Sequence, residues 1–144
     1  MDRRAEISRL FGVLLLAGTL PAALACGVCI EDKVAVVYDY EVVSRALDRG
    51  HHIAFFALEG SNTAGPEARR MLESLAGSAA GVDRGSSRVS LETRSLSVAY
   101  DPRRTPLPRL QQALEKKLAA RKLSLLPLKV IERPAELKAV TPLR

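Results

Sequence analysis

The sequence predicts an α+β domain, a four-stranded antiparallel sheet with two helices on one face, preceded by an extra N-terminal helix. Three segments at 52–59, 88–100 and 123–131 have the compact or alternating apolar pattern of strands, and the middle one divides into two. Two segments with apolar residues at helical spacing lie between them and begin near Pro66 and Pro106. The resulting order of strand, helix, strand, strand, helix, strand is the ferredoxin-like βαββαβ arrangement.

The first 25 residues have the pattern of a secretory signal peptide. Arginines at positions 3, 4 and 9 precede an apolar run at 10–20, which ends in the small-residue sequence at 21–25. The run is shorter than the roughly 20 apolar residues of a membrane-spanning helix, which favours cleavage after Ala25 over an uncleaved membrane anchor. We therefore predict a periplasmic or otherwise exported protein whose mature chain is one small domain beginning at Cys26.

Charge and motif content exclude several classes of function. The chain has 22 Lys and Arg against 16 Asp and Glu, a net charge of +6. Such a balance, spread over helix faces, indicates solubility and would also attract an anionic membrane surface or an acidic protein partner. No basic run is interleaved with aromatic residues, so we expect no nucleic-acid binding. No catalytic triad, nucleotide loop or paired carboxylates occur, so we expect no enzyme.

Residues 26–51 are predicted to form an N-terminal segment with a Cys-x-x-Cys motif and a helix. Val34, Val37, Val42 and Ala46 have roughly helical spacing. The acidic beginning of the segment and the glycine at position 50 also favour a helix. Its first valines would suit a strand equally well, and the sequence leaves both interpretations open.

The first strand and helix of the domain are predicted from 52–79. An apolar run at 52–59 is bounded by the loop Gly60–Gly65, the pattern of a buried strand. Pro66 then stands at the first position of a helix. Six apolar residues at helical spacing form the stripe of this helix that faces the sheet: Ala68, Met71, Leu72, Leu75, Ala76 and Ala79.

The second half of the domain repeats this pattern after a hairpin. Two alternating segments, 88–92 and 95–100, are joined by Thr93-Arg94, and their apolar residues would share one buried face. We expect Thr105 to cap a second helix, with Pro106 at its first position and a leucine stripe at 107–118.

The last strand and the C-terminal residues complete the prediction. Pro127 lies inside the strand at 123–131 and has no amide to donate to a neighbouring strand, which places this strand at an edge of the sheet. Residues 132–144 are predicted to be a flexible tail. The predicted organisation is therefore a signal peptide at 1–25, an N-terminal segment at 26–51, a domain at 52–131 and a tail.

Several segments of the domain fall in the register of a known family. Phe55–Gly60, the helix after Pro66, the hairpin Val89–Pro102 and the helix Leu107–Leu118 resemble the heavy-metal-associated domain. Copper chaperones, copper-transporting ATPases and mercury-binding proteins contain this domain. The most specific pieces are the glycine that ends the first strand and a hairpin that closes on Tyr-Asp-Pro. The resemblance implies a ferredoxin-like fold for 52–131.

The metal-binding loop of that family is altered in this chain. The family holds a soft ion such as monovalent copper through a Met-x-Cys-x-x-Cys loop directly after the first strand. Here Thr63 and Pro66 stand where the two cysteines would be. The resemblance therefore implies a degenerate domain without the metal-loop cysteines, and no ligand is carried over from the family.

The remaining candidate site is Cys26-Gly-Val-Cys29. A close pair of thiols can bind monovalent copper or another soft metal, or it can cycle between dithiol and disulfide. After export, a local disulfide between Cys26 and Cys29 is a further interpretation. The sequence Ala23-Leu-Ala-Cys26 also has the cysteine placement of a lipoprotein signal, and lipidation of Cys26 would leave only Cys29.

His51 and His52 are the only histidines in the chain. Imidazole is a ligand for copper, zinc and nickel, which makes His51 a candidate third ligand beside Cys26 and Cys29. Adjacent strand residues point to opposite faces, so at most one of the two histidines can take this role. The alternative interpretation is that both are polar residues at the beginning of a strand.

These observations leave three functions open. The first is an exported protein that binds or relays a soft metal through its Cys-x-x-Cys motif. The second is a thiol–disulfide accessory protein, in which one cysteine attacks the disulfide of a partner and the other resolves it. The third is a non-catalytic interaction module that has lost its metal site and pairs with a membrane or periplasmic protein through a sheet edge or its first helix.

Overall fold

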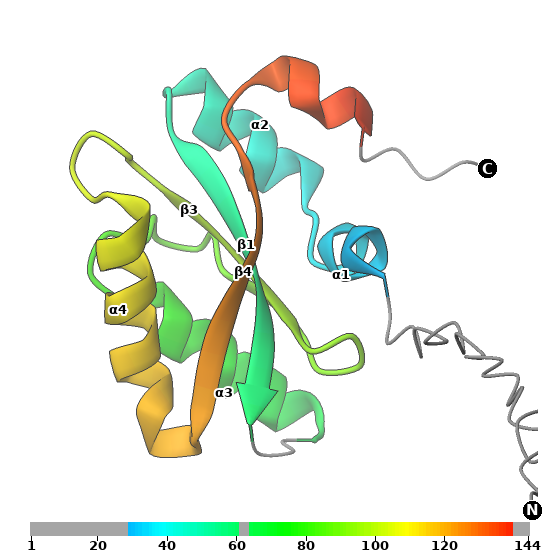
Figure 1. Ribbon diagram of the computed structural model, residues 1–144, viewed down its shortest axis with the longest axis vertical. Coiled ribbons are helices and arrows are strands. Elements are labelled where there is room, and N and C mark those ends of the chain that lie inside the picture. Colours follow the sequence, from blue (N-terminus) through cyan, green and yellow to red (C-terminus); the bar gives the residue numbers. More distant parts are fainter. Residues whose placement is uncertain (1–28, 61–63, 140–144) are drawn as a thin grey trace, which may run out of the picture.

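A four-stranded antiparallel sheet is the centre of the fold (Figure 1). The computed structural model describes residues 29–60 and 64–139. The strands are β1 (His52–Gly60), β2 (Arg88–Ser90), β3 (Ser95–Tyr100) and β4 (Leu123–Ile131), in the spatial order β2-β3-β1-β4. Every neighbouring pair is antiparallel. This order, with β3 and β1 at the centre, confirms the predicted ferredoxin-like fold.

Two helices, α3 (Pro66–Gly77) and α4 (Leu107–Leu118), cover one face of the sheet, and the short 3-10 helix η1 (Ala119–Arg121) follows α4. Their apolar stripes pack on the sheet, as the spacing of leucine and alanine residues predicts. The buried core of this layer comprises Ala54, Phe56, Leu58, Leu72, Ala76, Ala79, Val89, Leu96, Val98, Tyr100, Leu110, Leu114, Leu118, Leu123 and Leu125.

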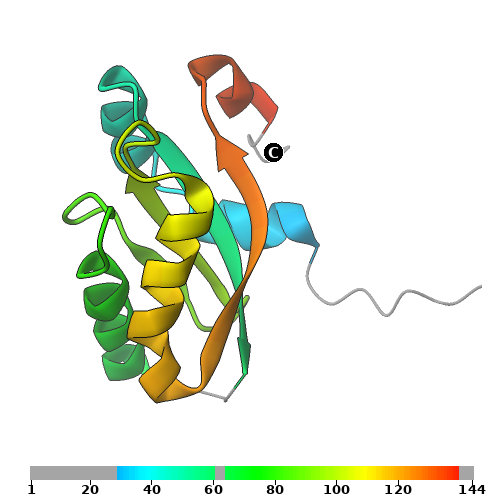
Figure 2. The same ribbon diagram turned by 60° about the vertical axis from the view of Figure 1, so that its left-hand side comes forward.

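The opposite face of the sheet is covered by the N-terminal segment, which forms two helices, α1 (Ile30–Val36) and α2 (Tyr40–Asp48). Figure 2 shows α1 on one side of the sheet and α3 and α4 on the other. The first helix ends at Val36, and Asp39, which has an extended backbone, begins the second, because its side chain accepts the Val42 amide at 3.1 Å as the N-cap. The segment at 30–50 is therefore helical, but it is divided.

Strand β1 is apolar along most of its length because both of its faces are covered. Ile53 and Phe55 pack under α1 and α2, whereas Ala54, Phe56 and Leu58 pack under α3 and α4. Successive strand residues point to opposite faces, so a continuous apolar run is what a strand between two helical layers requires. The N-terminal helices are thus part of the same folded unit as the sheet.

Both edges of the sheet are bonded to a glutamate of the neighbouring helix. The Val89 amide in β2 donates to Glu73 of α3 at 3.1 Å, and the Leu125 amide in β4 donates to Glu115 of α4 at 3.2 Å. Gln111 also donates to the Leu125 carbonyl at 3.1 Å. These backbone groups would otherwise be available to a strand of another chain. The edges are therefore partly closed by the helices.

Two further features agree with the sequence. Pro127 lies in an edge strand, as predicted, and the register of β4 against β1 shifts beside it, between Phe55 and Phe56. Gly60 ends β1 with a φ of +116°, and a side chain at this position would collide with the backbone carbonyl of Lys122 at the start of β4. Only glycine fits this close approach.

Three details differ from the sequence-based expectations. The hairpin strands end at Ser90 and resume at Ser95, so the turn spans 91–94 and includes Arg94 with a φ of 51°. Pro106 occupies the N-cap position of α4 without a side-chain hydrogen bond, and Leu107 is the first helical residue, so the predictions that Thr105 caps this helix and that Pro106 begins it are each wrong by one position. A 3-10 helix, η2 (Pro134–Ala139), occupies part of the predicted flexible tail.

None of the helices in the described ranges is long and apolar enough to span a bilayer.

Candidate functional site

Cys29 lies directly before α1, at the boundary of the described chain. The residue is exposed, and its backbone carbonyl accepts the Lys33 amide at 3.1 Å. Val34 and Val37 anchor the adjoining helix in the sheet core, which attaches Cys29 to the folded unit and leaves it accessible. Cys26, the predicted signal peptide at 1–25 and the predicted disulfide lie outside the described residues, so these three remain predictions.

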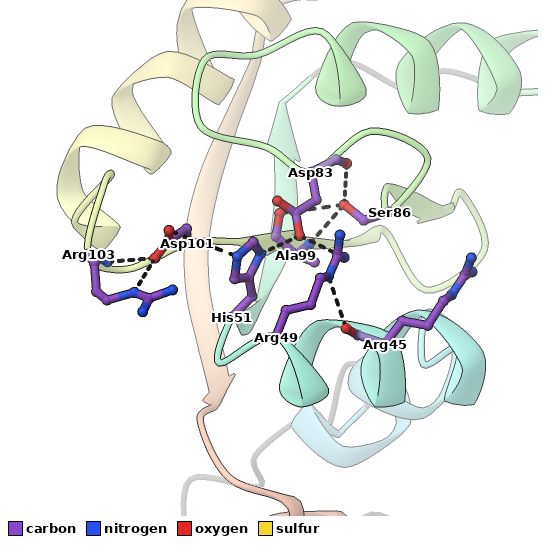
Figure 3. A network of polar contacts seen from close by, with 8 residues as sticks. All are labelled: Arg45, Arg49, His51, Asp83, Ser86, Ala99, Asp101 and Arg103. Carbon is purple, nitrogen blue, oxygen red and sulfur yellow. Dashed lines mark hydrogen bonds and ion pairs between the residues drawn. The ribbon is translucent and has the colours of Figure 1, made fainter.

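His51 lies between α2 and β1 and belongs to a polar network (Figure 3). Its Nδ1 is 2.7 Å from Oδ2 of Asp83, and its Nε2 is 3.9 Å from Oδ2 of Asp101. Asp83 comes from the connection between α3 and β2, and Asp101 follows β3. A neutral imidazole with its proton on Nδ1 would donate to Asp83. The network joins the beginning of β1 to two distant connections.

Each carboxylate of this network also has a guanidinium partner. Nη2 of Arg49 is 3.3 Å from Oδ2 of Asp83, and Nε of Arg103 is 3.1 Å from Oδ1 of Asp101. Burial raises the pKa of Asp101, but the hydrogen bonds and the positive charge of Arg103 outweigh it, and the pKa lies below its ordinary value. The negative charges of the two carboxylates are balanced by the positive charges of the two arginines. The network therefore chiefly stabilises the contact between the segments that it joins.

The described residues do not unite Cys29 and His51 in one group. Across 29–60 and 64–139, no three His, Cys, Asp or Glu side chains are arranged to hold a metal ion. His52 lies edge-on to Tyr100, with ring centroids 5.9 Å apart, and its Nδ1 is 4.0 Å from a carboxylate oxygen of Glu132. The site predicted from Cys26, Cys29 and His51 stays a prediction, and His51 is engaged by carboxylates.

The loop that carries cysteines in the heavy-metal-associated family leads here into a helix. Thr63, one of the two corresponding positions, lies outside the described residues. Pro66, the other, is the first residue of α3, and Gly65 precedes it with a φ of +93°. The backbone at the second position is therefore used to begin a helix, as an N-terminal proline commonly is.

Sequence reasoning missed Asp83 and Asp101 as partners of His51. Asp83 is 32 positions from the histidine, and no spacing rule relates the two. Asp101 could have been found, because pairing β1 with β3 places Tyr100 opposite His52 and brings the next residue close to His51. The contact between His51 and Asp83 depends on the path of the α3–β2 connection, which the sequence pattern does not reveal.

Comparisons with known proteins found a distant structural similarity. No protein-family model matches the chain, and no curated protein matches it. A solved structure with some similarity is oxidized MerP from Ralstonia metallidurans CH34, with a TM-score of 0.41 and 16% sequence identity. The match covers 55% of this chain and 99% of MerP. The ferredoxin-like fold rests on the strand order and on the helices that cover the sheet.

Proposed function

We propose that this protein is an exported carrier that binds a soft monovalent metal ion such as Cu(I) through the thiolates of Cys26 and Cys29. The observation that carries the proposal is the exposure of Cys29 at the start of a helix that is anchored in the core. A second thiol stands three positions earlier in the sequence. Two thiolates this close together suit a soft cation, which prefers sulfur over nitrogen and oxygen ligands.

Export supports the same proposal, because the residues before Cys26 have the pattern of a signal peptide. The mature chain would then begin at Cys26. The metal site would therefore form at the N-terminus, beside the helical layer of α1 and α2. Metal held there would be accessible for transfer to a membrane or periplasmic protein. The ion is the cargo of the protein in this proposal.

Cys26 and Cys29 are sufficient ligands in this proposal. Both ring nitrogens of His51 face carboxylates, at 2.7 Å and 3.9 Å, and recruiting the ring would break its contact with Asp83. A linear two-sulfur site needs no third ligand. The variant His51→Asn is therefore expected to keep its affinity for copper, and a loss of affinity would restore His51 as a ligand.

The accessibility of Cys29 also favours a second function, thiol–disulfide exchange with a protein partner. An accessible thiolate can attack a disulfide, and Cys26 could then resolve the mixed disulfide. The interaction-module alternative has less support at the sheet edges, because Glu73 and Glu115 already bond to backbone amides there. Metal binding and disulfide exchange make different demands on the two thiols.

The first test is the intact mass of the protein isolated from its native compartment, followed by anaerobic titration of the reduced protein with Cu(I) against a competing chelator. We expect cleavage after Ala25 and one bound ion. The ion should be lost in the double variant Cys26→Ser, Cys29→Ser and weakened in either single variant.

Other results would redirect the assignment. A Cys26 that carries lipid, together with absence of copper binding, would overturn the metal proposal. A disulfide that forms and exchanges readily with glutathione, again without copper binding, would favour the redox function. A double-serine variant that binds copper as tightly as the natural sequence would show that the ligands lie elsewhere.

A further inference from the structure

A groove of about 410 Å³ lies between α2 and the connection that leads from α3 to β2. Its size falls in the range of sites for small molecules. We propose that this arginine groove, defined by Arg45, Arg49 and Arg84 over a floor of Val42 and Ala99, binds a small organic anion. The proposal concerns a different part of the molecule from the cysteine pair and does not depend on copper binding.

The arginines of the groove differ in how they are engaged. Arg49 is held in place, because its Nη2 contacts Asp83 at 3.3 Å and its Nε donates to the Arg45 carbonyl at 3.1 Å. Arg45 uses its Nε on the Glu41 carbonyl at 3.1 Å. In the described part of the chain, no carboxylate oxygen lies within 4.0 Å of the guanidinium nitrogens of Arg45 or Arg84. These two groups retain donors for a ligand.

The local charge balance is positive. Asp48 is the one carboxylate among the described residues that line the arginine groove, and the nearby Asp83, which does not line it, is already contacted by Arg49 and by His51. Two guanidinium groups, those of Arg45 and Arg84, therefore stand against one carboxylate. Figure 3 shows Arg45 and Arg49 extending from α2 on the side of Ser86 and Asp83. An anion between Arg45 and Arg84 would be attracted by charges from α2 and from the α3–β2 connection.

The floor of the arginine groove is apolar. Val42 is 7% exposed and Ala99 has no exposed surface, so these two residues close the bottom of the groove, whose accessible lining as a whole is mostly apolar. The Ser86 hydroxyl is already used, because it donates to the Asp83 carbonyl at 2.7 Å and accepts the Ala99 amide at 3.0 Å. The lining of the groove above this floor thus offers apolar contact area more than hydrogen bonds. It suits the hydrocarbon part of a ligand, whereas the rim suits its charged group.

A carboxylate or a phosphate fits this arrangement chemically. Guanidinium groups bind both through paired, charge-assisted hydrogen bonds. Because Asp83 holds Arg49 in place, this side chain loses little conformational freedom when a ligand arrives. The ligand class is therefore a small molecule with an oxyanion at one end and an apolar body, and both oxyanions share the same recognition chemistry.

The test is a titration of the full-length chain, labelled with ¹⁵N, with phenyl phosphate, benzoate and inorganic phosphate, monitored by NMR. We expect phenyl phosphate or benzoate to shift the amide signals of Gly85, Ser86 and Ala99. The tighter of these two probes identifies the preferred oxyanion. Contact between the ring and the apolar floor should make the better aromatic probe bind about fivefold or more tightly than inorganic phosphate.

Matched variants make the experiment specific. Arg45→Gln and Arg84→Gln should each weaken binding about tenfold, the effect of losing one charged hydrogen-bond partner. The control is Arg70→Gln, an exposed arginine on α3, across the sheet from α2, which should leave the affinity unchanged. Thermal unfolding of each variant verifies that it is folded.

Three results would overturn the proposal. The first is that neither aromatic probe shifts these amides at millimolar concentration. The second is that Arg70→Gln weakens binding as much as Arg45→Gln and Arg84→Gln do, which would indicate general attraction to a basic surface. The third is that inorganic phosphate binds as tightly as the aromatic probes, which would remove the role of the floor.

Discussion

The two faces of the sheet are covered by helical layers of different construction. Under α3 and α4, a large aliphatic core is supplemented by Glu73 and Glu115, which bond to the two edge strands. Under α1 and α2, a smaller core is supplemented by polar links, among them the buried Ser97 hydroxyl, which donates to the Val37 carbonyl at 2.6 Å. Elements with less buried apolar surface open at lower free energy, so we expect the α1–α2 layer to open first.

The difference matters because the weaker layer adjoins both proposed sites. Cys29 precedes α1, and the arginine groove is lined by α2. The helices α3 and α4 are packed more extensively, and they support the opposite face of the sheet on which α1 and α2 lie. Accessible or adaptable sites are commonly found on the less stable parts of a fold. The comparison can be tested by perturbing each layer separately.

The largest effect is expected from two adjacent phenylalanines that are fully buried on opposite faces. Phe56→Ala creates a cavity under α3 and α4 and should lower the free energy of unfolding by about 4 kcal/mol, and Phe55→Ala, under α1 and α2, by about 3 kcal/mol. Urea denaturation measures both values. Hydrogen exchange should become faster chiefly in α2 for Phe55→Ala, and throughout the domain for Phe56→Ala.

This pair of variants is its own control, since residue type and burial are the same and only the face of the sheet differs. If Phe55→Ala accelerates exchange in α4 as much as in α2, the two layers unfold as one unit. The proposed difference between them would then be wrong.

An intermediate effect is expected at the sheet edges, where Glu73 of α3 and Glu115 of α4 each accept a backbone amide. Glu115→Ala and Glu73→Ala should each destabilise the fold by about 1 kcal/mol, because each leaves an edge amide without its partner. Glu115→Ala exposes the longer strand, β4, and should also promote self-association. Thermal unfolding and sedimentation velocity measure these two effects.

The control for the edges is Glu67→Ala, an exposed glutamate in the first turn of α3. It should change neither stability nor association by a comparable amount. Equal stability of all three variants would mean that the edge hydrogen bonds contribute little beyond what water provides.

The smallest effect is expected from the ion pair that links the α1–α2 layer to β2. Arg88 contacts Asp39 at 2.8 Å. Burial raises the pKa of Asp39, but hydrogen bonds from Val42 and Arg88 outweigh it, so the pKa is lowered on folding. The stabilisation is therefore fully present above the ordinary pKa of an aspartate, and it is lost as the pH falls through the lower pKa of the folded state.

The variant Asp39→Asn retains a residue that can cap α2 and removes the charge. Its stability should be lower than that of the natural sequence by less than about 1 kcal/mol at pH 7, and the difference should shrink as the pH falls below about 4. Chemical denaturation across this range provides the measurement, with Asp48→Asn as the control. A difference that persists undiminished at pH 2 would contradict an electrostatic origin.

Much of the fold could be predicted from local patterns. The leucine stripe of α4 has helical spacing, the hairpin residues alternate, and Pro127 has no amide to donate, so helix, strands and an edge position could each be identified within a short window. The division of 30–50 at Asp39 was harder to predict, because both halves share one helical period. The first helix ends at Val36, and the extended backbone and capping side chain of Asp39 begin the second.

The two candidate sites also differ in whether a local sequence pattern could reveal them. Cys26 and Cys29 form a motif within four residues, and the sequence alone determines that the two cysteines are three positions apart. The arginine groove depends on residues from α2, β3 and the α3–β2 connection, and nothing in the sequence relates Arg45 to Arg84. Contacts between distant segments follow from sheet register and from the packing of each helix, which no local pattern encodes.

The sequence by itself therefore determined the order of strands and helices within 52–131 and the presence of a Cys-x-x-Cys motif, whereas it left the segment before them open between helix and strand. These features depend on residues a few positions apart, whose spacing controls backbone conformation and side-chain direction. Only the tertiary structure decided that α1 and α2 cover the second face of the sheet and that His51 faces Asp83 and Asp101. Those arrangements arise when segments distant in the sequence bury a shared surface, and the path of the whole chain determines which segments meet.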